Sequence, residues 1–382
     1  MADDMKTLQP VSHKILLLSL SFENGGVERD TINLANGFVE LGMEVTIVVR
    51  ERKLFFLSML NPSVRILVFK GANDKQLERE LCELLKREQP AVVSSAKDED
   101  DAIAIRAKRK LADHISTRFY LRIGTPLATR AVEQKGLFLS RWLSRRRLQK
   151  TLADCDGMIT YSSGVARELV DFYQVPPDKV VSLPNPTITP NFFELADKEI
   201  QHPWFVPDSP PVIIAVGRLA RVKDFPTLLR AFAILHQQRA CRLIILGDGK
   251  QKPKLAKLAE ELGIQKDIEL LGFCENPYAY LKKSALLAVS SIREGGPIVL
   301  IEALALGIPA VATDCPTGPR EILQGGKLGA LTPPGDAPAL AEAMLKTLDN
   351  PPNADFLKHG VAAFTQENSC RAHLNAMELL DN

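Results

Sequence analysis

Short apolar runs alternate with amphipathic segments along most of the chain, and this pattern predicts strands that alternate with helices. The first unit has an apolar run at 14–20, a tight turn at Gly25-Gly26, an amphipathic helix through about Leu41 and another apolar run at 42–49. Parallel strands need a crossover helix, so this unit is predicted to be βαβ. Further strands are predicted at 91–94, 118–123 and 157–161, and helices at 73–88, 100–112 and 163–173.

A proline-rich passage divides the chain into two halves with similar patterns. Prolines recur from Pro184 to Pro211, which disfavours regular structure and predicts a domain boundary there. The predicted domains are residues 1–195 and 196–365, and a C-terminal helix at 366–382 is expected to pack back on the first domain. In the second half, strands are predicted at 212–216, 241–246, 268–271, 286–290 and 309–313, and helices at 224–236 and 337–348.

This order of elements predicts an α/β protein with two doubly wound parallel sheets. Ligands of such sheets bind beyond the carboxyl ends of the strands. Most of the loops with unusual chemistry lie at that edge, so two facing domains are predicted to enclose a central cleft. These loops are 21–26, 217–223, 247–249, 272–273 and 290–296.

Two carboxylates flank a predicted anion site in the second half. Gly295, Gly296 and Pro297 end an apolar strand, and a helix is predicted to begin at about Pro297. Its free N–H groups and positive dipole end suit a phosphate. Glu294 and Glu302 beside it are acceptors for hydroxyl hydrogens, which favours a nucleotide sugar. The alternative is an ordinary acidic helix start and an exposed helix face.

Arg218 and Lys223 follow the first strand of the second half in one loop. A planar guanidinium and a lysine point charge suit a diphosphate, although either residue alone is as well explained as a surface charge. Gly25-Gly26 is either a simple turn or a place where backbone N–H groups approach the same diphosphate. Neither loop has the Gly-x-Gly-x-x-Gly or Gly-Lys-Ser/Thr pattern, which disfavours dehydrogenases and P-loop proteins.

Composition narrows the class of protein. The chain has 382 residues, of which 46% are hydrophobic, and no apolar run approaches the length of a membrane span. The first fourteen residues lack the features of a secretory signal. The six cysteines are scattered without Cys-x-x-Cys spacing, which argues against zinc and a disulfide framework. We therefore expect a reduced, cytoplasmic protein.

The net charge of +2 conceals a basic segment, since residues 104–150 hold thirteen Lys or Arg against two acidic residues. Within it, Trp142 and neighbouring leucines recur at helical spacing beside Arg145, Arg146 and Arg147. This pattern is typical of a helix on an anionic membrane surface. Packing of Trp142 on the domain core, with solvated arginines, is an equal alternative. Nucleic-acid binding is disfavoured because no recognised motif accompanies the charge.

Several of these segments together resemble glycosyltransferase family 4, which has the GT-B fold. The resemblance is specific from about residue 212 to 336 and weaker in the first half, where Gly25-Gly26, 162–164 and 184–186 also fit. The segments that carry it are Gly217-Arg-Leu with Lys223, Gly247-Asp-Gly, 271–273, Ser290, Glu294 and Glu302 seven residues apart, 303–309 and 314–323. The last of these resembles a branch that builds bacterial surface polysaccharides or lipid-linked oligosaccharides.

The resemblance implies retaining transfer of a sugar from a nucleotide-linked donor, usually a UDP-sugar, without a metal or other cofactor. Arg218 and Lys223 would hold the diphosphate, Glu294 the sugar hydroxyls and Glu302 the ribose. The other donor-binding positions implied are Gly25, Gly26, Gly217, Gly247, Phe273, Gly295, Gly296 and Ile298. The acceptor would be a glycan or a lipid-linked glycan, bound by an enzyme on the inner face of the cytoplasmic membrane.

One departure from the family concerns the first domain. Many relatives have a histidine after the strand that corresponds to 118–123, whereas this chain has Gly124 and Thr125 there. Arg122 or Thr125 is the candidate to contact the sugar or acceptor instead. Two other functions remain open, namely an epimerase or hydrolase of the same fold and a sugar-nucleotide or polysaccharide-binding protein without activity.

Overall fold

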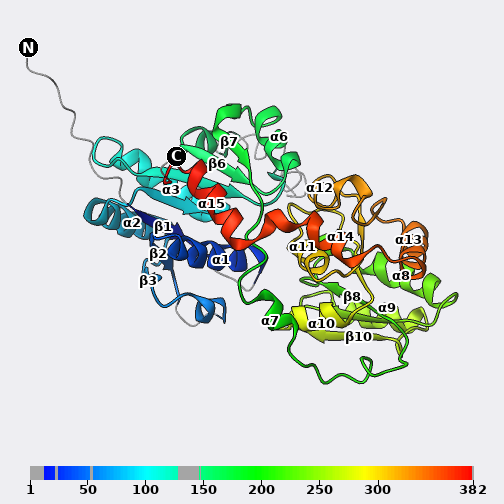
Figure 1. Ribbon diagram of the computed structural model, residues 1–382. Coiled ribbons are helices and arrows are strands. Elements are labelled where there is room, and N and C mark those ends of the chain that lie inside the picture. Colours follow the sequence, from blue (N-terminus) through cyan, green and yellow to red (C-terminus); the bar gives the residue numbers. More distant parts are fainter. Residues whose placement is uncertain (1–12, 22–24, 52–54, 128–145, 147, 381–382) are drawn as a thin grey trace, which may run out of the picture.

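Two parallel β-sheets, each covered by helices, form two domains that lie side by side (Figure 1). The structure is a computed structural model that describes residues 13–21, 25–51, 55–127, 146 and 148–380. The predicted pair of doubly wound parallel sheets is confirmed.

The N-terminal sheet has seven parallel strands in the order β3-β2-β1-β4-β5-β6-β7. The order reverses between β1 and β4, so the loops after these strands point to opposite sides of a crevice at their carboxyl ends. The strands are β1 (Lys14–Leu18), β2 (Glu44–Val49), β3 (Arg65–Val68), β4 (Val92–Ser95), β5 (Arg118–Ile123), β6 (Gly157–Thr160) and β7 (Val180–Ser182).

The C-terminal sheet has six parallel strands in the order β10-β9-β8-β11-β12-β13, with the reversal between β8 and β11. The loops after these two strands therefore border the crevice of the second domain. The strands are β8 (Val212–Val216), β9 (Arg242–Leu246), β10 (Ile268–Gly272), β11 (Leu286–Val289), β12 (Ala310–Thr313) and β13 (Ala330–Thr332).

Helices cover both faces of each sheet, which explains why the central strands are continuous apolar runs. In β1, Leu16 and Leu18 pack into the core on one face, whereas Ile15 and Leu17 pack into the core on the other.

The helices of the first domain are α1 (Gly26–Glu40), η1 (Phe55–Met59), α2 (Asp74–Glu88), α3 (Asp98–Leu111), α6 (Ser163–Asp171) and η2 (Pro177–Lys179). Those that follow are α7 (Phe192–Ala196), η3 (Arg221–Lys223), α8 (Phe225–His236), α9 (Lys252–Glu261), α10 (Pro277–Lys283), α11 (Ile298–Ala305), α12 (Pro319–Ile322), η4 (Gln324–Gly326), α13 (Ala337–Asp349), α14 (Ala354–Gly360), η5 (Ala362–Phe364) and α15 (Gln366–Ala376).

The sequence pattern missed three strands, β3, β7 and β13, and each is the outermost strand of its sheet. They have only three or four residues and are mostly half-buried. An edge strand of this kind has neither a long apolar run nor a clear alternation, so periodicity gives a weak signal.

Helix ends differ slightly from their predicted positions. Helix α3 begins at Asp98, two residues earlier than predicted, and four acidic residues fill its first turn, where they favour the positive end of the helix dipole. Helix α11 begins at Ile298, and Pro297 is its N-cap rather than its first residue.

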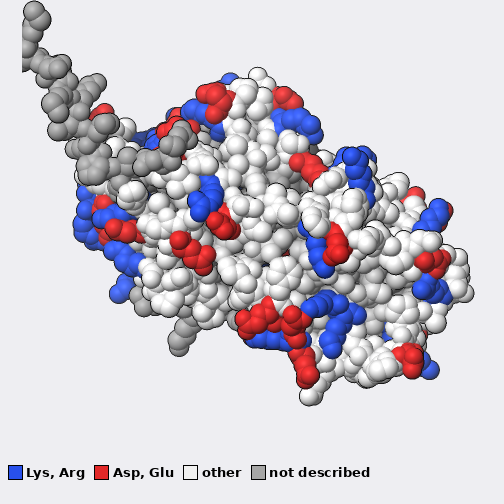
Figure 2. Space-filling model, in the orientation of Figure 1, with Lys and Arg blue, Asp and Glu red and all other residues white. Residues whose placement is uncertain are grey.

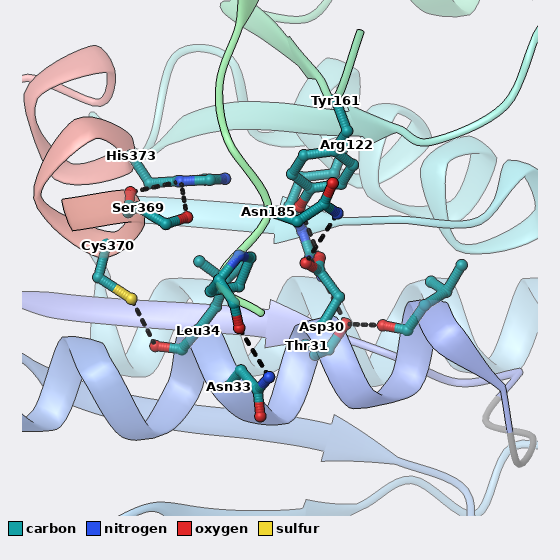
Figure 3. Close-up of polar contacts among 12 residues, drawn as sticks. Asp30, Thr31, Asn33, Leu34, Arg122, Tyr161, Asn185, Ser369, Cys370 and His373 are labelled. Atoms are coloured by element: carbon teal, nitrogen blue, oxygen red, sulfur yellow. Dashed lines mark hydrogen bonds and ion pairs between the residues drawn. The ribbon is translucent and has the colours of Figure 1, made fainter. Parts of the chain in front are cut away.

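The C-terminal helix α15 returns to the first domain and lies beside α1 (Figure 1). Cys370 and Leu374 are buried in the same core as Phe38. Gln366 Nε2 donates to the carbonyl oxygen of Asn33 at 2.7 Å, and Figure 3 shows the Sγ atom of Cys370 pointing at the carbonyl oxygen of Leu34. The proposed boundary at residue 195 stays a prediction.

Gly37 allows α1 and α15 to approach, because a Cβ atom there would lie only 2.5 Å from Sγ of Cys370. We predict that Gly37→Ala lowers the thermal unfolding midpoint, with an overpacking cost of ~1–3 kcal/mol. Cys370→Ala removes the obstructing sulfur, so the double variant should be more stable than the two single effects add up to. Circular dichroism melts of the four proteins check this. A Gly37→Ala variant as stable as the parent would contradict it.

Candidate active site

The loops after β8 and β11 meet in an ion pair between two predicted site residues. Lys223 Nζ lies 2.6 Å from Glu294 Oε1, and Ser291 Oγ donates to the same oxygen at 2.5 Å. Ser290 Oγ donates to the carbonyl oxygen of Lys223 at 2.8 Å. The pair is therefore fixed by both loops at the point where the strand order reverses.

The N-terminus of α11 faces the first domain at very close range. A Cβ atom at Gly295 would overlap the carbonyl oxygen of Gly124 and lie 3.1 Å from Cα of Thr125. A Cβ atom at Gly26 would lie 3.5 Å from Cδ1 of Ile298. The first turn of a helix has unpaired N–H groups and a partial positive charge, so this predicted anion site lies between the domains.

Glycines also bring the loops after β8 and β9 together. Gly247 has φ of 141°, and a Cβ atom on it would overlap the carbonyl oxygen of Gly217. Gly217 in turn lies beside the Lys223 side chain. Arg218 is exposed next to Gly217, and Phe273, after β10, is 50% exposed.

Glu302 is buried inside the interface, and its partner comes from the other domain. Arg29 Nη1 of α1 lies 2.6 Å from Glu302 Oε1, and the Glu302 side chain is only 2% exposed. The same guanidinium donates to the Tyr278 hydroxyl at 3.2 Å. Burial raises the pKa of the Glu302 carboxyl, and Arg29 and Tyr278 oppose this shift.

Arg122 lies in a buried polar network instead of at the surface of the cleft (Figure 3). Its guanidinium donates to Asp30 Oδ2 at 3.0 Å and to Thr31 Oγ1 at 2.8 Å, and the Tyr161 hydroxyl donates to Asp30 at 2.6 Å. Burial raises the pKa of Asp30, although Arg122 and the hydrogen bonds oppose it. A sugar would have to displace this network to touch Arg122, so that contact stays a prediction. Thr125 is exposed beside Gly295.

The sequence patterns assigned no site role to four residues that shape this interface, and Arg29 and Tyr278 are two of them. Glu321 accepts bonds from the backbone N–H groups of Ser163 at 2.7 Å and Gly164 at 3.0 Å, and Thr317 donates to the carbonyl oxygen of Glu294. Arg29 comes just after the glycine pair, next to Glu28. Nothing in this local sequence indicates that its partner is Glu302, 273 residues away.

Most of the predicted membrane helix lies outside the described residues. Trp142, Arg145 and Arg147 all belong to that part of the chain. Arg146 is exposed and helical. Farther back in the basic segment, α3 has Arg106 2.7 Å from Glu78 and Lys108 2.6 Å from Asp156. Figure 2 shows charges of both signs interspersed over the face that it draws.

Within the part of the chain that the structure describes, no group of three or more His, Cys, Asp or Glu side chains is placed to hold a metal ion. No helix there has the length and apolar character needed to cross a bilayer.

Two family models match the two halves of the chain. Residues 24–189 match Glycosyltransferase Family 4, and residues 197–360 match Glycosyl transferases group 1.

Curated relatives match over part of their length. One is the N-acetylgalactosamine-N,N'-diacetylbacillosaminyl-diphospho-undecaprenol 4-alpha-N-acetylgalactosaminyltransferase of Campylobacter jejuni, which is 35% identical over 46% of each protein. Another is the lipopolysaccharide 1,6-galactosyltransferase of Salmonella typhimurium, which is 35% identical over 34% of this chain and 37% of the relative. The chain thus spans less than half the length of these relatives.

Solved structures resemble the whole fold. HepE of Anabaena, in complex with UDP and glucose, has a TM-score of 0.78 at 16% identity and covers 96% of this chain and 100% of its own. Family models thus match both domains, and a solved structure matches the whole fold. The chain belongs to the group 1 glycosyl transferases with the GT-B fold.

Proposed function

We propose that the protein is a retaining glycosyltransferase that moves a sugar from a UDP-sugar to a glycan or lipid-linked acceptor in surface polysaccharide biosynthesis. The observation that carries the proposal is the Lys223–Glu294 pair at the glycine-rich N-terminus of α11, facing Gly124 of the other domain. The relatives from Campylobacter and Salmonella, named for transfer to a diphospho-undecaprenol and to lipopolysaccharide, support the acceptor class.

The donor would lie across this interface. The backbone at Gly295, Gly296 and Ile298 would face the diphosphate, with Arg218 and Lys223 as countercharges. Glu294 would accept hydrogen bonds from sugar hydroxyls, and Glu302 would accept them from the ribose. Phe273 would border the base, and Gly25 and Gly26 would let the backbone of the first domain approach the phosphates, beside Gly217 and Gly247.

Transfer with retention places the acceptor on the same face of the sugar as the leaving phosphate. The bond from the anomeric carbon to the phosphate oxygen breaks, and a bond to the acceptor oxygen forms on that face. The acceptor proton passes to the leaving phosphate oxygen. Arg218, Lys223 and the α11 N-terminus would stabilise the negative charge that develops there, so the proposed chemistry needs no bound metal. Thr125, next to Gly295, and Arg122 are the proposed contacts to the sugar or acceptor.

A nucleotide-release assay over UDP-, GDP- and ADP-sugars, with and without lipid-linked acceptor extract, tests the function. A transferase releases nucleotide only when acceptor is present, and we expect this with a UDP-sugar. Release without acceptor would instead indicate a hydrolase. Conversion of the sugar without transfer would indicate an epimerase, and binding without turnover a binding protein.

We predict that Lys223→Ala and Glu294→Ala each lower the transfer rate at least tenfold, because a charge-assisted contact is worth roughly 1.5–3 kcal/mol. The measurement is kcat/KM for the active donor, with the thermal midpoint recorded to show that folding is intact. Lys282→Ala and Glu342→Ala remove exposed ion pairs elsewhere in the same domain and serve as matched controls. Near-normal turnover in both site variants would refute the assignment.

We also propose that the basic segment holds the enzyme on the anionic inner face of the cytoplasmic membrane. Replacing Arg145, Arg146 and Arg147 with Ala should weaken sedimentation with anionic liposomes, most strongly at low salt, where charges are least screened. Replacing the exposed Lys254 and Lys257 of α9 is the control. Equal sedimentation of the triple variant and the parent would leave these arginines without a membrane role.

A further inference from the structure

The ion pair between Arg29 and Glu302 joins the two domains inside the proposed donor site. It has an N–O distance of 2.6 Å, and the two side chains are 19% and 2% exposed. Four residues before Glu302, Ile298 lies on the same face of α11 and meets Gly26 of α1. One face of α1 thus lies against one face of α11. Gly26 lies near the helix start that is proposed to bind phosphate, and Arg29 lies beside Glu302.

Arg29 is held in place from several sides. Its guanidinium carbon lies 5.8 Å from the ring centroid of Phe56 and 5.6 Å from that of Tyr278. These aromatic faces favour a cation and leave little room for the arginine to turn away. The Arg29 guanidinium is therefore held in one orientation toward Glu302.

A nearby positive charge favours ionisation of the buried Glu302 carboxyl. Burial raises the pKa of its carboxyl, and Arg29 is the strongest opposing influence, followed by a hydrogen bond from Tyr278. Asp30, which lines the same small pocket, is itself paired with Arg122. Among the described groups around Glu302, Arg29 thus supplies the positive charge that favours the ionised form of this buried carboxyl.

The pocket beside the pair has an unsatisfied polar atom. Thr187, from the segment that crosses between the domains, lines this pocket with Arg29 and Glu302. Its Oγ1 atom is buried without a hydrogen-bond partner among the described residues. A carboxylate has acceptor positions on both oxygens, so the bond from Arg29 leaves Glu302 able to accept hydroxyl groups as well. The pocket has room for about one water-sized group, which Thr187 and Glu302 could bond.

We propose that Arg29 is a positioning residue of the donor site, supplied by the opposite domain, which holds Glu302 ionised and oriented for the ribose hydroxyls. Recognition of the ribose is then complete only when the domains are closed. This inference rests on the proposed function, in which Glu302 binds the ribose, and adds the group through which Glu302 is able to do so.

The test compares binding of UDP with binding of 2′-deoxy-UDP and 3′-deoxy-UDP by calorimetry, from pH 6 to 9, using the full chain. The parent should prefer UDP across the range. Arg29→Met should lower that preference about tenfold near neutral pH, on the scale of losing one charge-assisted hydrogen bond. Without the arginine the pKa of Glu302 rises further, so its ionised fraction at a given pH falls. The preference of the variant should therefore recover as the pH is raised.

Further variants separate this role from a structural one. Arg29→Lys keeps the charge and should restore most of the preference, and Arg29→Met should have no added effect in an Glu302→Gln background. Arg118→Met is the matched control, because Arg118 also bridges to a distant carboxylate, Glu378 on the C-terminal segment, but at the surface. Arg29→Gln replaces Arg29→Met if the latter does not fold, as judged by its thermal midpoint.

The outcomes distinguish the two proposals. If Glu302→Gln removes the ribose preference but the Arg29 variants bind like the parent at every pH, the Arg29 inference is wrong and the donor site stands. If Glu302→Gln keeps the preference, or the parent shows none, the assigned role of Glu302 fails and the inference fails with it.

Discussion

The closed arrangement depends on the absence of a side chain at Gly295. Any Cβ atom there would overlap the carbonyl oxygen of Gly124, so the N-terminus of α11 reaches the opposite domain only because this residue is glycine. The other contacts between the domains follow from that approach. Glu321 can then bond to the first turn of α6, and Glu302 can meet Arg29. A site divided between two domains is assembled by a close backbone contact.

Sequence reasoning succeeded where the proximity of loops follows from the geometry of parallel sheets. Loops that follow neighbouring strands must meet at one edge, and this alone places Lys223 near Glu294. It failed where partners are set by the meeting of domains, as for Arg29 and Tyr278. The contact of Arg122 with the ligand stays a prediction, because Asp30, 92 residues away, holds Arg122 in a buried network. The missed strands lie at sheet edges and have only three or four residues, too few to form a distinct apolar run.

The two interdomain crossings of the chain lie side by side and are bonded to each other. Ile188, on the way out of the first domain, forms a parallel bridge with Thr365 on the way back, and its N–H donates to the carbonyl oxygen of Phe364 at 3.0 Å. The returning chain then continues into α15, whose Ser369 bonds to Pro184 at 2.7 Å. Both crossings are thus anchored on the first domain.

This paired crossing restricts how the domains separate. The two crossings are bonded to each other at Ile188 and Thr365, so we expect the domains to open by rotation about that line rather than by separation of two flat faces. In such a rotation, atoms close to the crossings move little, and the displacement grows with distance from them. Asn33 Nδ2 donates to the carbonyl oxygen of Pro186 at 2.7 Å, and we expect this hydrogen bond near the crossings to persist when the domains open. The domains would then return to the same relative position after each opening, because the crossings hold them together at one edge.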